Sequence, residues 1–204
     1  MAKRNTRQEL IDSGLAFIDA QGLDALTLRT LGAELGLHHT ALYRHFRSKE
    51  DLLDSIFRSL LGQAFEAVPA DIPDPRQRLT ELCLAMRGVF ESHPGLSGAI
   101  VQGAGMMEEA LDIQLAAIGA LREMGVPEDR LGTAYQAIES FVGGSSLYDF
   151  ANAPQHAVER NERYGRLQDP ALARAAASEH ATIRHTEDAF RWGLDALIDA
   201  AVRP

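Results

Sequence analysis

The sequence predicts an all-α protein in which a three-helix N-terminal domain is followed by a larger helical domain. Apolar residues recur at helical spacing along most of the chain, and no stretch shows the period-2 alternation of a half-buried strand. Three prolines between residues 69 and 75 interrupt this pattern and mark the best domain boundary. We therefore expect a first domain of residues 1–50, a connecting helix of residues 51–68 and a second domain of residues 69–204.

The first domain should begin with a helix over residues 7–20. The segment 27–49 then predicts two short helices joined by a tight turn. Three leucines at i, i+3 and i+7, beginning with Leu28, turn one face of the first of these helices inward. Thr27 can cap this helix, and Gly36 can turn the chain without the steric penalty of a Cβ atom.

The second short helix is expected over residues 38–46. Leu42 and Phe46 supply its apolar side, whereas its other side is polar, aromatic and basic and has no evident intramolecular role. A further helix opens at Ser48, where Asp51 completes a capping box. A helix-turn-helix motif presents its second helix to the major groove in this way. The sequence therefore predicts a protein that binds duplex DNA.

Residues 6–61 resemble the DNA-binding domain of the TetR family of transcriptional repressors. Many helical pairs mimic a bare helix-turn-helix, but the run L-Y-x-H-F-x-S-K-x-x-L-L after it is much more specific. The matching residues are Leu26-Thr27-Leu28-Arg29, Leu31, Gly36, Ala41-Leu42-Tyr43-Arg44-His45-Phe46 and Ser48-Lys49-Glu50-Asp51-Leu52-Leu53. The resemblance implies a helix-turn-helix DNA-binding domain followed by a helical domain for ligand binding and dimerisation.

The resemblance also implies which side chains touch DNA. The implied phosphate contacts are Thr27, Tyr43, His45 and Lys49. The implied base contacts are Arg29, His39, Thr40, Ala41 and Arg44. Arg44 suits bidentate pairing with guanine, and the backbone N–H groups of the helix at Ser48 suit phosphate. Tyr43 can alternatively be part of the core, and Arg7 belongs either to an arm near phosphate or to a solvated tail.

Charge is distributed unevenly along the chain of 204 residues, whose net charge is −9. Residues 1–49 carry seven Lys/Arg and five Asp/Glu, a net charge of +2, which leaves −11 for residues 50–204. A modest basic head on an acidic body attracts phosphate at one end only and predicts few phosphate contacts per subunit. The single cysteine and the lack of a long apolar run predict a cytoplasmic protein without a membrane partner.

Further helices are expected behind the prolines. One begins at Pro75 and ends at His93, one covers residues 106–124, and the next continues to about residue 151. A polar loop over residues 152–168 and a helix over residues 169–185 should follow. Thr186 opens the last helix, residues 187–202.

The last helix resembles the closing helix of tetracycline-repressor-like ligand domains, which pairs with an earlier helix of small residues into a four-helix dimer interface. The alternative is that both helices pack inside one subunit. A two-fold dimer would place two recognition helices one DNA turn apart, ~34–36 Å, and require a palindromic operator. The residues expected at this homodimer interface are Phe141, Gly143, Gly144, Phe190, Leu194, Leu197 and Ile198.

The resemblance further implies a pocket for an unknown small-molecule effector behind residue 60. Each candidate can alternatively be plain core. Tetracycline itself fits poorly, because its repressors use a histidine-coordinated magnesium and residues 96–105 contain no histidine. No cofactor and no resident metal is expected. The candidate lining residues are Leu61, Phe65, Cys83, Met86, Phe90, Gln102, Met106, Met107, Gln114, Tyr135 and Glu139.

Other classes of protein fit less well. The segment 103–105 lacks the strand and third glycine of a dinucleotide loop, and no strand leads into the segment 143–146 as a nucleophile elbow requires. An enzyme is therefore not expected. A regulator of the same fold that is controlled by a partner protein, or that acts as an activator, stays open as an alternative.

Overall fold

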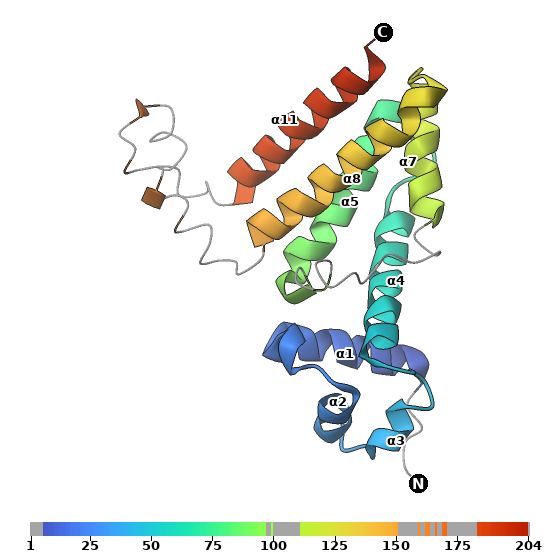
Figure 1. Cartoon of the computed structure of the whole chain (residues 1–204), viewed down its shortest axis with the longest axis vertical. Helices are drawn as coiled ribbons and strands as arrows, with labels where there is room; N and C mark the ends of the chain where they lie inside the picture. Colours follow the sequence, from blue (N-terminus) through green and yellow to red (C-terminus); the bar gives the residue numbers. More distant parts are fainter. Residues whose placement is uncertain are drawn as a thin grey trace.

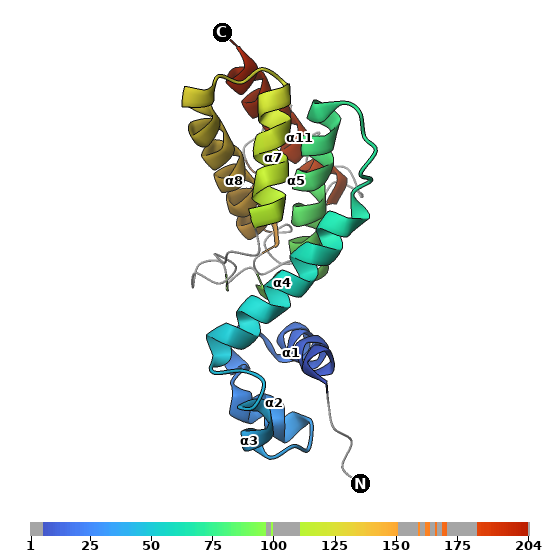
Figure 2. The same ribbon diagram turned by 90° about the vertical axis from the view of Figure 1, so that its right-hand side faces the viewer.

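The computed structural model describes residues 6–96, 99, 111–150 and 183–203, with a few isolated positions between 159 and 170. Every regular element in these ranges is helical, which confirms the predicted all-α class. Figure 1 shows α1, α2 and α3 gathered at one end and α5, α7, α8 and α11 bundled at the other. The view in Figure 2 shows α4 as the rod that joins the two groups. We call these groups the head (residues 6–48) and the body (residues 69–203).

The head begins with α1 (Arg7–Gln21), followed by a short 3-10 helix (η1, Leu23–Ala25) and α2 (Leu28–Glu34). Thr6 and Glu9 close a capping box at α1, with the Thr6 hydroxyl accepting from the Glu9 amide at 3.2 Å. Thr27 caps α2 as predicted by accepting from the Thr30 amide at 3.0 Å. Gly36 turns the chain with φ +63°, a conformation that L-residues with a Cβ rarely adopt.

The predicted second helix is shorter than expected. α3 covers only His39–Leu42, and a turn replaces helix between Leu42 and Phe46. The carbonyl of Leu42 accepts from the amides of both His45 and Phe46 at 2.9 Å, so the chain tightens there. The i, i+4 spacing of Leu42 and Phe46 fits a helix, but a turn that buries both side chains satisfies the same pattern.

The connecting helix α4 (Lys49–Ala67) begins as predicted after Ser48, whose hydroxyl accepts from the Asp51 amide at 3.3 Å. The predicted capping box is only half formed. The Asp51 carboxylate accepts from the Arg47 amide at 2.8 Å, so it caps the preceding turn. Asp51 therefore ties the segment after α3 to the start of α4.

The body contains α5 (Pro75–Ser92), α7 (Leu111–Glu123), α8 (Glu128–Phe150) and α11 (Ile183–Val202). α11 starts at Ile183, four residues before the predicted start, because no helix-breaking residue separates the two positions. A short 3-10 helix (η2, Pro94–Leu96) follows α5. The predicted helix start at residue 106, most of the loop 152–168 and most of the helix 169–185 lie outside the described residues, and the described positions within that loop, residues 159, 162, 163 and 166, are helical.

Two hydrophobic clusters organise the chain. The first fills the head, but it also contains Phe90, Leu96 and Ala99, which follow the predicted domain boundary. The rings of Phe57 and Phe90 lie 6.3 Å apart, and the Asp19 carboxylate contacts His93 Nδ1 at 2.8 Å. The end of α5 and η2 thus complete the core of the head. The second cluster lies among the four body helices.

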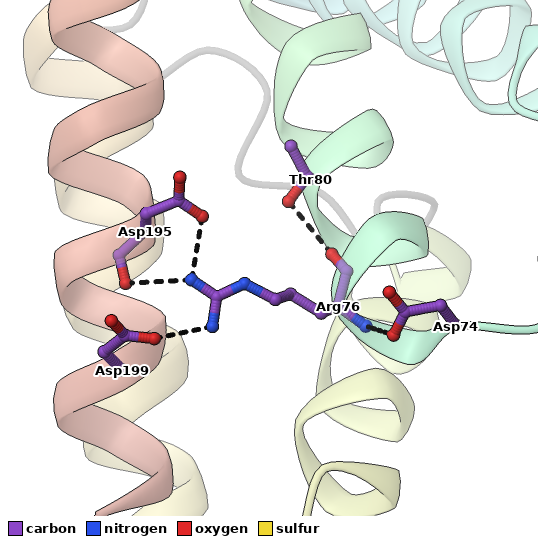
Figure 3. Close-up of polar contacts among 5 residues, drawn as sticks. All are labelled: Asp74, Arg76, Thr80, Asp195 and Asp199. Carbon is purple, nitrogen blue, oxygen red and sulfur yellow. Dashed lines mark hydrogen bonds and ion pairs between the residues drawn. The ribbon is translucent and has the colours of Figure 1, made fainter.

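Polar contacts fix the last two turns of α11 against the rest of the body. Figure 3 shows Arg76 at the start of α5 reaching the carboxylates of Asp195 and Asp199, at 2.8 and 2.6 Å. Arg130 of α8 donates to the carbonyls of Ala200 and Arg203, which lie at the carboxyl end of α11. α11 is therefore clamped to its own subunit along one side.

Candidate nucleic-acid interface

The predicted DNA-contacting side chains gather at the free end of the head, on and around α3. Thr40 and Arg44 are exposed, Ala41 and His45 are half-buried, and Tyr43 is 55% exposed. Tyr43 is therefore a surface residue and not part of the core. The described α3 segment is held from behind by Leu42 and Phe46, both fully buried. His39 lies on α3, and its side chain is outside what the structure describes.

The predicted contacts Thr27, Thr40 and Lys49 already make intramolecular hydrogen bonds, and the Thr40 hydroxyl lies 2.9 Å from His38 Nδ1. Lys49 Nζ donates to the carbonyl of Leu23 at 2.8 Å, which leaves two ammonium hydrogens for a phosphate. The Thr27 hydroxyl accepts from the Thr30 amide as the cap of α2 and also lies 3.0 Å from the Thr30 hydroxyl, so a phosphate would compete with this second contact. Arg29 projects from α2 as an exposed residue.

The electrostatics of the α4 terminus are mixed. Its free N–H groups and helix dipole favour an anion, whereas Glu50 and Asp51 place two carboxylates in the same turn. A hydrogen bond from Ser48 is the main cause that lowers the pKa of Glu50, so this exposed carboxylate stays ionised at neutral pH. The carboxylates limit the phosphate affinity of the head and are consistent with its small net charge.

The sequence left open whether Arg7 lies in an arm near phosphate or in a solvated tail. It is neither in an arm nor in a tail, because its guanidinium donates to Ser55 Oγ at 2.6 Å. It also lies 5.0 Å from the centre of the Phe46 ring and 3.9 Å from the Asp51 carboxylate. A groove of about 630 Å³ is lined by Arg7 together with Tyr43, Arg44, His45, Phe46, Arg47, Ser48, Glu50, Asp51 and Asp54.

The predicted effector-site residues are divided among the body core, the head core, α4 and positions outside the described residues. Cys83, Gln114, Tyr135 and Glu139 come together where α5, α7 and α8 meet: the Tyr135 hydroxyl donates to Glu139 at 2.8 Å and also interacts with Gln114. Burial, followed by the neighbouring Glu139, raises the pKa of Tyr135. Burial raises the pKa of the Cys83 thiol to about 12, so it stays protonated. Glu139 itself is exposed.

The remaining candidates lie elsewhere. Phe90 belongs to the core of the head, because it packs on Phe57, and is thus misplaced as a lining residue of a body pocket. Leu61 is buried on α4, and Phe65 is half-buried one turn further along. Met86 packs on the body core. The predictions for Gln102, Met106 and Met107 lie outside the described residues.

The expected dimer residues need a correction. Phe190, Leu194 and Ile198 are buried within the single chain, so this stripe of α11 has no surface left for a second copy. Amphipathicity alone does not tell a face that packs within a subunit from one that packs between subunits. Phe141 stacks on Phe190 with the ring centres 5.3 Å apart, and Leu197 packs partly into the same cluster.

A different face of the same two helices is exposed. A Cβ atom added at Gly143 or Gly144 would meet nothing within 4 Å, so these glycines do not mediate close packing inside the chain. Two aromatic residues of this region are exposed and were not predicted as interface residues: Tyr148 at 51% and Trp192 at 77% exposure. Their exposure depends on helix phase, which hydropathy read residue by residue does not give.

An ion pair in the body, which no pattern in the sequence predicts, lies where three body helices meet. Arg87 of α5 is buried, the Asp149 side chain of α8 is 10% exposed, and the two side chains approach to 2.8 Å. The Arg87 guanidinium also lies 4.9 Å from the centre of the Phe190 ring of α11. Among the residues that the structure describes, no group of three His, Cys, Asp or Glu side chains could hold a metal ion.

The helix pair at the head, with its buried inner face and exposed polar outer face, defines a helix-turn-helix DNA-binding protein. Residues 10–56 match the family model "Bacterial regulatory proteins, tetR family", and residues 69–200 match "Tetracyclin repressor-like, C-terminal domain". The chain therefore belongs to the TetR family of transcriptional regulators.

Individual relatives agree with this assignment. The HTH-type transcriptional repressor Rv1353c of Mycobacterium tuberculosis is 27% identical over 214 residues, which cover 96% of this chain and 80% of the relative. A possible TetR family regulator of Streptomyces coelicolor A3(2) superposes with TM-score 0.79 at 25% identity, covering 97% and 100% of the two chains. Streptomyces coelicolor ActR in complex with actinorhodin superposes with TM-score 0.74 at 22% identity, covering 99% and 97%. No helix in the described ranges could cross a membrane.

Proposed function

We propose that the protein is a dimeric repressor that binds a palindromic operator and is released from it by a small-molecule effector. The single observation that carries the DNA part is the exposed surface of the α3 segment. Tyr43 and Arg44 point outward there, while Leu42 and Phe46 behind them fix the backbone. Arg44 is the residue that we expect to read a guanine, and Thr40 and Ala41 can contact a thymine methyl group.

A second copy is expected on the exposed face of α8 and α11. Ala137, Gly144 and Tyr148 are exposed and share one side of α8, at i, i+7 and i+11. Ala189, Trp192 and Ala196 are exposed and share one side of α11, at i, i+3 and i+7. The two helices are held together by the contact between Phe141 and Phe190. Small residues flanking two aromatic side chains suit close helix packing with a buried anchor.

The effector is expected among α5, α7 and α8, where Tyr135 and Gln114 add polar groups to an apolar cluster. The similar ActR structure is a complex with actinorhodin, which supports a small-molecule ligand for a protein of this fold. A route from the body to the head is available, because Phe90 and Leu96 of the body complete the head core. A hundredfold loss of DNA affinity requires the effector to prefer the released state by ~2.7 kcal/mol.

The first test is selection from a random duplex library, followed by fluorescence anisotropy on the selected duplex at two salt concentrations. We expect a palindrome that is bound by a dimer with strong salt dependence. Selection should be repeated after denaturing and refolding the protein, which removes any effector that was purified with it. A refolded, helical dimer that enriches no sequence would contradict the proposal.

Two variants test the assignment of the DNA-binding face. Arg44→Ala should cost about 1–3 kcal/mol on the selected duplex and relax base preference at one position of each half-site. Lys49→Ala should weaken binding to all duplexes alike and reduce the salt slope by about 1. Wild-type affinity in both variants would show that another surface faces the groove.

A further inference from the structure

The recognition helix α3 is too short to keep its orientation without contacts from other elements of the head. α3 has four residues, and a helix of one turn is not stable in isolation. The residues that follow it, Tyr43 to His45, form a turn with no regular hydrogen-bonded continuation beyond Phe46. The orientation of Arg44 must therefore be fixed by contacts with other elements of the head.

Arg7 makes the contacts that can do this. Its guanidinium lies over the Phe46 ring, at 5.0 Å, and so covers the residue that ends the recognition segment. The same guanidinium donates to Ser55 Oγ at 2.6 Å, and Ser55 in turn donates to the Asp51 carbonyl at 2.6 Å. Ser55 is buried whereas Arg7 is partly exposed, so this hydrogen bond is shielded from water on the Ser55 side only.

The network continues into the backbone of the recognition segment through Asp51. One carboxylate oxygen of Asp51 lies 3.9 Å from Arg7, and the other accepts from the Arg47 amide at 2.8 Å. The first residue of α1, the first two turns of α4 and the segment after α3 are thereby joined. A planar guanidinium can stack on a ring and donate sideways at the same time, which an ammonium group cannot do.

We propose that Arg7 is a positioning residue for operator recognition, which holds the α3 segment at the angle that base contacts require. Its effect passes through Phe46 and Asp51 and does not depend on a bond to DNA. This proposal rests on the function proposed above, in which the α3 segment enters the major groove. It predicts that loss of Arg7 lowers specificity more than it lowers general affinity for DNA.

The test compares Arg7→Gln, Arg7→Lys and Arg58→Gln on the selected operator and on a random duplex. Arg58 is an exposed arginine further along α4, so its variant removes the same charge from a neighbouring site. Arg7→Gln should weaken operator binding about 10-fold or more and random-duplex binding less than 3-fold, with an unchanged salt slope. Arg7→Lys should not restore operator affinity, and Arg58→Gln should behave as wild type.

Three results would overturn the proposal. A salt slope reduced by about 1, with equal losses on both duplexes, would make Arg7 a phosphate contact. Full rescue by Arg7→Lys would mean that its charge alone matters. Operator binding unchanged in Arg7→Gln, while Arg44→Ala has lost it, would remove Arg7 from recognition and leave the proposed function intact. Equal helicity and random-duplex binding by the variants control for unfolding, and Ser55→Ala offers a milder break of the same network.

Discussion

The two hydrophobic cores of this protein are closed in different ways. The head core is built mainly from one continuous stretch of sequence, and its last members, Phe90 and Leu96, come from the body. The body core is built from helices far apart in the sequence, and α11 closes it through Phe190 and an adjacent buried ion pair. The head thus takes part of its apolar core from the body, whereas the body completes its core with its own helices and adds an ion pair among them.

This difference bears on regulation. A segment that belongs to the body by sequence but packs into the head core cannot move without disturbing both, because packed cores do not deform continuously. The end of α5 and η2 are such an element. Gly95 lies so close to α1 that a Cβ atom there would be 3.1 Å from the Ile18 carbonyl oxygen, so the junction is tightly packed.

The largest effect is expected from breaking the buried ion pair. Asp149→Ala leaves the buried Arg87 guanidinium without its carboxylate, and we expect a loss of about 3–5 kcal/mol in the free energy of unfolding. Urea denaturation followed by circular dichroism measures this loss. The double variant Arg87→Met/Asp149→Leu should recover most of it, because neither charge then stays buried. A loss below about 1 kcal/mol for Asp149→Ala would show that water reaches Arg87.

The next largest effect tests the shared core. Leu96→Ala should cost about 3 kcal/mol, because it opens a cavity at a fully buried position of the head cluster. Hydrogen exchange measured by mass spectrometry should show faster exchange in α1 and α2. The matched control is Leu194→Ala, equally buried in the body core, which should leave exchange in the head unchanged. The same pattern of exchange in both variants would mean that the two cores unfold as one.

A smaller effect is expected at the proposed subunit face. Trp192→Ala should weaken the dimer by about 2 kcal/mol, roughly 30-fold in dissociation constant, if this residue anchors the interface. Sedimentation velocity over a concentration series measures the change. Leu115→Ala is the control, because Leu115 is 63% exposed on α7 and does not belong to the proposed face of α8 and α11. A dimer that is weakened by Leu115→Ala and not by Trp192→Ala would move the interface to α7.

The smallest effect is expected for Arg76→Met. Its pairs with Asp195 and Asp199 have short distances, but all three side chains are partly exposed, so water and salt screen them. The hydrogen bonds that Arg76 donates to the carboxylates of Asp199 and Asp195 raise the pKa of Arg76, which therefore stays charged at every accessible pH. We expect a loss of about 1 kcal/mol or less that shrinks in 1 M NaCl, measured by thermal unfolding. A loss that is insensitive to salt would point to packing of the Arg76 stem instead.

The sequence predicted the head well because the signals there are local. Thr27, Gly36 and Ser48 each determine a cap or a turn within three or four residues, and all three act as predicted. The error in α3 arose because Leu42 and Phe46 fit a helix and a tight turn equally well. The arrangement around Arg7 could not be predicted, since Ser55 and Phe46 meet it only after the head has folded.

The contacts between the body helices could not be predicted in the same way. The apolar stripe of α11 was recognised, but its partner was not, because burial within one chain and burial between two chains leave the same periodic pattern. Nor does spacing reveal that Arg87 and Asp149 meet, since each resembles a surface residue of an amphipathic helix. Of the candidate effector-site residues, those from three different helices that meet around Tyr135 could be named only through the family resemblance.

The shared core also limits how this regulator can be recombined with its relatives. A chimera joined at the prolines of residues 69–75 would lose Phe90 and Leu96 from the head core, and the other parent would have to supply side chains of matching shape there. A workable exchange of DNA specificity should transplant either the whole stretch through Ala99 or only the exposed side chains of α3 and the turn after it. The unit of modular exchange in this chain is thus larger than the motif that contacts the operator.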